Sequence, residues 1–164
     1  CAYADAYDAV REENEPRLSP SRLKNVPDWP ENVALRDRRA DIKKQYGVVG
    51  ERACFFTEGG YCTLFSEGMK LAGNGGADDL IARAAALVYE DEFGHMCKGI
   101  VGLDMENMSA ADWTLMTELS VELAGMRIDM RNAQFSFPLS ARRIKEIKSG
   151  DIEPINFDFQ KAAA

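Results

Sequence analysis

The chain has 164 residues, of which 46% are hydrophobic, and this is enough for one domain with a substantial core. Its 27 acidic and 20 basic side chains give a net charge of −7, which argues against a nucleic-acid partner because phosphate binding requires a basic surface. No apolar run is long enough to span a bilayer and no secretory signal is recognisable, so we expect a cytoplasmic protein without a membrane partner.

The N-terminal part of the chain predicts a short helix followed by a long connection. Residues 2–15 have a helical composition that ends at Pro16. Four prolines between residues 16 and 32 exclude a regular helix there. We therefore expect an extended crossover connection over 16–32 rather than a tight hairpin.

A long helix is expected next, over residues 36–71, because its apolar residues recur at helical spacing. Five glycines in this range each lower the helical propensity by about 1 kcal/mol relative to alanine. Glycines tolerated in a helix indicate close packing or a local bulge. The glycine-rich residues 73–76 then predict a turn.

Two further long helices are expected after this turn. Asp78 and Asp79 favour the positive end of a helix dipole, and that helix continues to about Asp104. Ser109 and Asp112 form a variant of the capping box, which predicts a helix that begins there and extends to about residue 135. The apolar stripe of this last helix consists of Leu115, Leu119, Leu123, Met126 and Met130.

The fold class that follows is all-α, because no strand pattern competes with these helices. We expect one helical domain over residues 1–164, built as a bundle. Its three long core helices lie between residues 36 and 135. A short C-terminal helix is expected over 140–149, ended by Gly150.

The four cysteines, Cys1, Cys54, Cys62 and Cys97, lack any C-x-x-C spacing. Cys54 and Cys62 lie about two turns apart on one expected helix, roughly 12 Å by helical rise, which is too far for a disulfide. We therefore expect free, partly buried thiols in a reducing cytoplasm rather than zinc ligands.

The only histidine, His95, lies three residues after Glu92 on the apolar face of the helix expected over 78–104. That face consists of Ile81, Ala85, Val88, Glu92, His95, Gly99 and Gly102. A carboxylate and an imidazole in a bundle interior need partners, because an unpaired buried charge is very costly. A metal ion would satisfy both, and so would an ordinary core hydrogen bond from the histidine to a carbonyl or a glutamate.

Glu58 is the expected third metal ligand, since it too is a charge among apolar residues at helical spacing. It lies about sixteen residues before the centre of the glycine turn, and Glu92 lies about seventeen residues after it. On two antiparallel helices, the two carboxylates would therefore lie at about the same distance from the turn. Glu51 shares the face of Glu58 but lies two turns deeper and is the weaker candidate. Glu67 is expected to be solvated.

A helix with Glu58, a turn, and a helix with Glu92-x-x-His95 together resemble half of the di-iron carboxylate site of the ferritin-like superfamily, over about residues 46–103. The resemblance implies a ferritin-like antiparallel bundle and a non-haem iron protein that uses dioxygen or peroxide, as a ferroxidase or an oxygenase. It also implies that Glu58 is a terminal ligand of one iron, that Glu92 bridges two irons, and that His95 caps the iron bound by Glu58. Manganese or a mixed centre is the alternative.

The second half of such a site is not visible in the sequence, which has no other histidine. Glu118, Glu122 and Asp129 form an acidic stripe on the next helix, and we interpret this stripe as solvated or paired with Arg127 or Arg131.

Two arrangements would complete the site. A homodimer would supply the second half across a two-fold axis. Alternatively, a helix pair precedes Cys1, and the long crossover slightly favours this second arrangement because ferritin-like bundles use such a connection between their second and third helices.

Other interpretations remain open from the sequence. A metal-free helical-bundle interaction protein would use the Glu92–His95 pair only to specify packing. Haem ligation by His95 is disfavoured because Met96 points elsewhere on the helix. Tyr61 and Tyr89 lie about one turn from Glu58 and Glu92, and we expect core filling from them rather than a role beside a metal.

Overall fold

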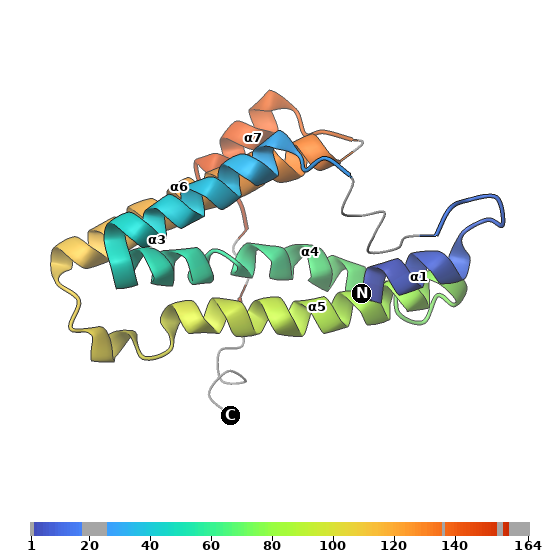
Figure 1. Cartoon of the computed structure of the whole chain (residues 1–164), viewed down its shortest axis with the longest axis horizontal. Helices are drawn as coiled ribbons and strands as arrows, with labels where there is room; N and C mark the ends of the chain where they lie inside the picture. The colour runs from blue at the N-terminus through green and yellow to red at the C-terminus, as the bar shows by residue number, and fades with distance from the viewer. Residues whose placement is uncertain (1, 18–25, 136, 154–155, 158–164) are drawn as a thin grey trace. The chain divides into compact units, whose positions relative to one another are not determined.

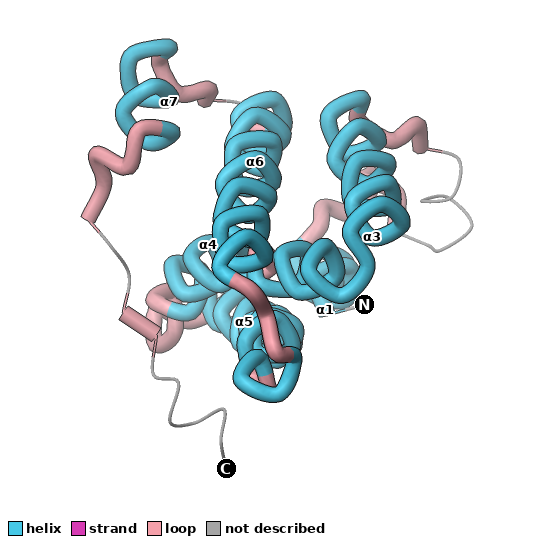
Figure 2. The backbone as a smooth tube through the Cα atoms, turned by 90° about the vertical axis from the view of Figure 1, so that its left-hand side faces the viewer, coloured by secondary structure: helices cyan, strands magenta, loops and turns pink. Residues whose placement is uncertain are grey.

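The computed structural model describes residues 2–17, 26–135, 137–153 and 156–157. Within these ranges the chain forms α-helices and one short 3-10 helix joined by loops, and no strand, which confirms the all-α fold class (Figures 1 and 2). No helix in these ranges combines the length and the apolar character that crossing a bilayer requires. The expected thiol Cys1 and most of the crossover, residues 18–25, lie outside the described residues.

Contacts along the chain divide it into two compact units. Unit 1 contains Cys1–Asp28 and Tyr61–Phe93, and unit 2 contains Trp29–Gly60 and Gly94–Ala164. Helix α5 (Gly76–Ile100) is continuous through the boundary after Phe93. The expectation of a single helical domain over 1–164 stays a prediction.

Unit 1 contains α1 (Ala2–Val10), most of α4 (Gly59–Met69) and the first part of α5. Helix α1 ends at Val10, short of the residue 15 expected from the sequence. Small and aromatic side chains hold this unit together: the rings of Tyr3 and Phe65 lie 6.0 Å apart, and a Cβ atom on Gly68 would lie 2.9 Å from Ala85 Cβ. The glycine turn before α5 is confirmed, with left-handed φ values at Gly73, Gly75 and Gly76.

The single helix expected over 36–71 is wrong. The chain forms α3 (Pro30–Phe56) and α4, separated by Thr57 and Glu58. Helix α3 is itself broken at Gly47, where φ is 54° and ψ is −129°, a backbone conformation that favours glycine strongly. The chain changes direction at this break (Figure 1). The helix also begins earlier than expected, with proline in its first turn, where its missing N–H costs nothing.

The core of unit 2 is formed where α3 packs against α6 (Ala110–Gln134). Helix α6 matches its predicted range, and its capping box is present: Ser109 Oγ accepts from Asp112 N at 3.2 Å, and Asp112 accepts from Ser109 N at 2.8 Å. The buried residues of α6 are Met116, Leu119, Leu123, Arg127 and Met130. Three members of the predicted stripe are thus buried, whereas Leu115 and Met126 are half-buried.

Helix α5 stops at Ile100, before the expected residue 104, because Gly102 adopts a left-handed conformation with φ of 76° and a 3-10 helix, η1 (Leu103–Glu106), follows. Helix α7 (Ala141–Lys148) agrees with the prediction of a short helix that ends before Gly150.

The acidic stripe on α6 is salt-bridged as expected, but with partners that the sequence did not suggest. Glu122 accepts two hydrogen bonds from Arg38 of α3, at 2.6 and 2.9 Å. Asp129 accepts from Lys148 of α7 at 2.7 Å. Glu118 is exposed. The expected partner Arg127 is buried.

The end of α3 and the last turns of α5 approach each other at backbone distance. A Cβ atom on Gly99 would lie 2.7 Å from Phe56 Cα and would also collide with Phe56 N. Backbone atoms cannot move aside as the end of a flexible side chain can, so glycine is required at this position for a steric reason.

We expect Gly99→Ala to lower the free energy of unfolding by about 1–3 kcal/mol, because the methyl group overpacks this contact. The measurement is urea denaturation. The matched control is Gly125→Ala on α6, where a Cβ atom meets nothing within 4 Å and helical propensity predicts a small gain in stability. Equal stability of the two variants would contradict the close approach.

The Arg38–Glu122 pair predicts a pH-dependent contribution to stability. Hydrogen bonds from Arg38 lower the pKa of Glu122 from its ordinary value. The contribution is therefore fully present above the ordinary glutamate pKa of about 4.3 and is lost as pH falls through the lowered folded-state value.

We expect Arg38→Gln to lower the free energy of unfolding by less than about 1 kcal/mol at neutral pH, because 41% of the Glu122 side chain is exposed and solvent screens the pair. The difference from the unmodified protein should shrink as the pH of the urea titration falls below the ordinary glutamate pKa. A difference that grows on acidification would contradict the assigned direction.

Candidate metal centre

Glu58 lies at the break between α3 and α4, and local hydrogen bonds fix this break. Thr57 N donates to Ala53 O at 3.1 Å, Thr57 Oγ1 donates to Cys54 O at 3.0 Å, and Glu58 N donates to Phe55 O at 2.9 Å. These bonds satisfy carbonyl groups at the end of α3 that would otherwise lack helical partners.

A second close approach places Glu58 next to α5. A Cβ atom on Gly59 would collide with Met96 Sδ and would lie 2.9 Å from Met96 Cγ. Together with the contact between Phe56 and Gly99, this approach fixes the chain on both sides of Glu58 against the turns of α5 that carry His95. Gly59, one of the five glycines that weaken the helix expected over 36–71, is thus explained by packing, and so is Gly99 of α5.

Glu58 and His95 meet directly. Glu58 Oε2 lies 3.0 Å from His95 Nδ1, and the two side chains are 13% and 34% exposed. The other oxygen of Glu58 accepts a hydrogen bond from the guanidinium of Arg39, a residue in the part of α3 before Gly47. The ring centroids of Phe55 and His95 lie 6.5 Å apart, so an aromatic side chain covers one approach to the imidazole.

Glu92 lies one helical turn before His95 on α5 and is half-buried. Glu58, Glu92 and His95 each offer one ligand atom, and these atoms all lie within 4.8 Å of one another. Among the described residues this is the one such group of three or more His, Cys, Asp or Glu side chains. All three ligands expected from the sequence are therefore brought together.

The donor set fits a divalent transition metal. Imidazole nitrogen and carboxylate oxygen bind such ions at about 2.0–2.2 Å, so donors that share one ion lie about 3–4 Å apart. Small side-chain movements would bring the three donors to that spacing. The sequence did not predict that Arg39 lies beside Glu58. The only indication of this contact is Gly47, where α3 changes direction.

The remaining candidates lie elsewhere. Glu51 is exposed on α3, and Glu67 is exposed and paired with Lys70 at 2.6 Å, as expected for a solvated residue. Tyr89 stacks on Phe93 with centroids 6.1 Å apart, and burial raises its pKa, while the ring of Tyr61 lies near Phe65. These ring contacts are those of core filling.

Cys54, Cys62 and Cys97 are free and buried. Cys54 belongs to α3 and Cys62 to α4. The expectation that both lie on one helix is therefore wrong, because the helix expected over 36–71 is divided into α3 and α4. Burial raises the pKa of the Cys54 and Cys97 thiols, which favours the protonated form over the thiolate that binds metal.

Comparison of the chain with protein-family profiles, curated proteins and solved structures finds no match. The function must therefore be inferred from the site itself.

We expect Arg39→Gln to lower the free energy of unfolding of metal-free protein by about 1–3 kcal/mol, because it removes a charged hydrogen-bond donor from a mostly buried carboxylate. Arg38→Gln, one residue away and more exposed, is the matched control with the smaller loss given above. Similar losses in both variants would contradict the specific role of Arg39 beside Glu58.

Proposed function

We propose that this chain is a non-haem iron protein in which Glu58, Glu92 and His95 hold one ion as half of a di-iron carboxylate centre of the ferritin-like type. The observation that carries the proposal is the convergence of two carboxylates and the only histidine of the chain within 4.8 Å. Three such donors are a typical set for iron, manganese or zinc.

The ligands that this chain supplies set the charge of the site. Glu58 and Glu92 contribute two negative charges, and a neutral His95 contributes none. A second copy related by a two-fold axis would add the same three donors, so four carboxylates would balance two divalent ions. A helix pair outside the present sequence is the alternative source of the second half.

A di-iron centre of this kind, when bound, supplies activation of dioxygen or peroxide for oxidation. The residues of this chain would hold and shield it. Arg39 orients Glu58, because its guanidinium binds one carboxylate oxygen. Phe55 lies on one side of the His95 imidazole, because the two rings are neighbours. We propose an oxidoreductase, either a ferroxidase or an oxygenase.

A second candidate function has an observation in its favour. Glu58 already has Arg39 and His95 as partners, so the cluster is satisfied without an ion. In that case the group would specify packing in a metal-free interaction protein.

Titration of chelator-treated protein with ferrous iron under anaerobic conditions, followed by calorimetry, separates the two functions. We expect about one iron per chain and a rise in unfolding free energy of about 2.7 kcal/mol at a free concentration of 100 times Kd. His95→Ala and Glu92→Gln should abolish binding, whereas the exposed Glu118→Gln should not. The Arg39→Gln variant should bind iron more tightly, because it has no guanidinium that competes with the ion for Glu58.

Absence of binding heat, together with an unchanged thermal unfolding curve in excess iron and in excess manganese, would contradict the metal proposal and favour the metal-free protein. Sedimentation with and without iron tests the homodimer, since completion by a second copy predicts that iron promotes dimer formation.

A further inference from the structure

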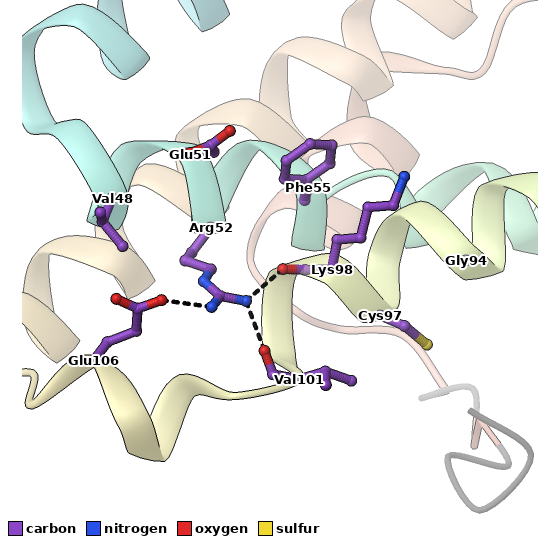
Figure 3. A pocket seen from close by; sticks show the side chains of 9 residues that line it. All are labelled: Val48, Glu51, Arg52, Phe55, Gly94, Cys97, Lys98, Val101 and Glu106. Carbon is purple, nitrogen blue, oxygen red and sulfur yellow. Dashed lines mark hydrogen bonds and ion pairs between the residues drawn. The ribbon is translucent and has the colours of Figure 1, made fainter. Parts of the chain in front are cut away.

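A groove of about 560 Å³ lies in unit 2, and Figure 3 shows the residues that line it. Its volume falls in the usual range for small-molecule sites. The part of α3 after Gly47 forms one wall, the last turns of α5 form the other, and η1 closes one end. The lining residues are Val48, Glu51, Arg52, Phe55, Gly94, Cys97, Lys98, Val101 and Glu106.

Each wall is one face of a helix. The α3 residues that line the groove recur at i, i+3, i+4 and i+7 from Val48. Those of α5 are Gly94, Cys97 and Lys98, at i, i+3 and i+4, and Val101 follows directly after the helix. Facing helical surfaces of this kind normally interdigitate. Here two of the three α5 residues are a glycine and a cysteine, and these small residues leave the space open.

Hydrogen bonds from Arg52 hold the groove in shape. Its guanidinium donates to Lys98 O at 2.6 Å, to Val101 O at 2.7 Å and to Glu106 Oε1 at 2.6 Å, as the dashed lines of Figure 3 show. These bonds tie α3 to the end of α5 and neutralise the charge of Glu106. Such preformed walls lower the entropic cost of binding a ligand.

The remaining charges favour an anion. The ammonium groups of Lys43 and Lys98 lie 4.9 and 5.8 Å from the centroid of the Phe55 ring. Lys98 lines the groove, and Lys43 lies beside its Phe55 wall. The exposed carboxylate of Glu51 opposes these two positive charges, whereas Glu106 is already paired with Arg52. Phe55 supplies apolar surface directly beside the cations, and Val48 and Val101 add apolar surface elsewhere in the groove.

We propose that this groove binds a small organic acid with an apolar body. The body lies against Phe55, Val48 and Val101, and the acidic group pairs with Lys98. Phe55 links the groove to the candidate metal centre, because its ring also neighbours His95. The organic acid is thus placed as the substrate of the proposed oxidation; this last step rests on the proposed function, whereas binding in the groove does not.

Gly94→Leu tests the groove directly. A Cβ atom on Gly94 meets nothing within 4 Å, so leucine enters without a steric clash at Cβ and occupies space at the Gly94 end of the groove. Gly125→Leu on α6 is the matched control, since its Cβ atom also meets nothing within 4 Å and it does not line the groove. The probe is 8-anilinonaphthalene-1-sulfonate, which combines an aromatic body with an anionic group, and its fluorescence is followed in chelator-treated protein.

We expect Gly94→Leu to weaken probe binding about tenfold or more and Gly125→Leu to leave it unchanged. Lys98→Gln should weaken the anionic probe about tenfold but leave the neutral analogue N-phenyl-1-naphthylamine unaffected. Unchanged binding in Gly94→Leu, or equal losses in the two glycine variants, would overturn the proposal. Thermal unfolding of each variant verifies that it is folded.

The iron titration of the same samples keeps the two proposals distinguishable. Probe binding that depends on Gly94 without any iron binding would support the groove and remove its role as a substrate site. Iron binding together with probe binding that Gly94→Leu does not change would support the metal centre and overturn the groove proposal.

Discussion

The close approach of α5 to the chain around Glu58 is the constraint on which the rest of the site depends. At Gly99 the backbone of Phe56 occupies the space of a side chain, and at Gly59 the side chain of Met96 does so. Larger residues would push the two segments apart, and then the 3.0 Å contact between Glu58 and His95 would be lost. The groove lined by Phe55 and Cys97 lies beside the same contact. The same close packing therefore shapes both the candidate metal centre and the groove.

The partial burial of Glu58 explains the polar neighbours around it. A carboxylate that is only 13% exposed needs compensation, and the chain supplies a guanidinium on one oxygen and an imidazole on the other. A divalent ion would compensate the same charge more strongly, because it adds a second positive charge at bond distance. The cluster is therefore built so that an ion and Arg39 compete for one carboxylate, which makes the affinity for metal a difference between two favourable interactions.

Local signals in the sequence predicted much of this structure. The Ser109–Asp112 capping box, the glycine turn and the grouping of Glu58, Glu92 and His95 depend on spacing within one helix or across one turn, where geometry is nearly fixed. The continuous helix over 36–71 was wrong because apolar periodicity persists through Gly47, and only the backbone conformation reveals the break. The approach of Arg39 and the groove beside Phe55 could not be predicted, since both arise from chain reversal and from small residues that leave space between helices.

The break at Gly47 also bears on the order in which these contacts form. Because α3 turns back there, Ile42 meets Gly50, Lys43 lies over Phe55, and Arg39 reaches Glu58 at a separation of 19 residues. Short loops cost little entropy to close, and contacts local in sequence form rapidly. The carboxylate and its guanidinium partner thus belong to a local helical hairpin, whereas the imidazole arrives only with α5. We therefore expect a single glycine to give the acidic ligand a countercharge before the rest of its site is assembled.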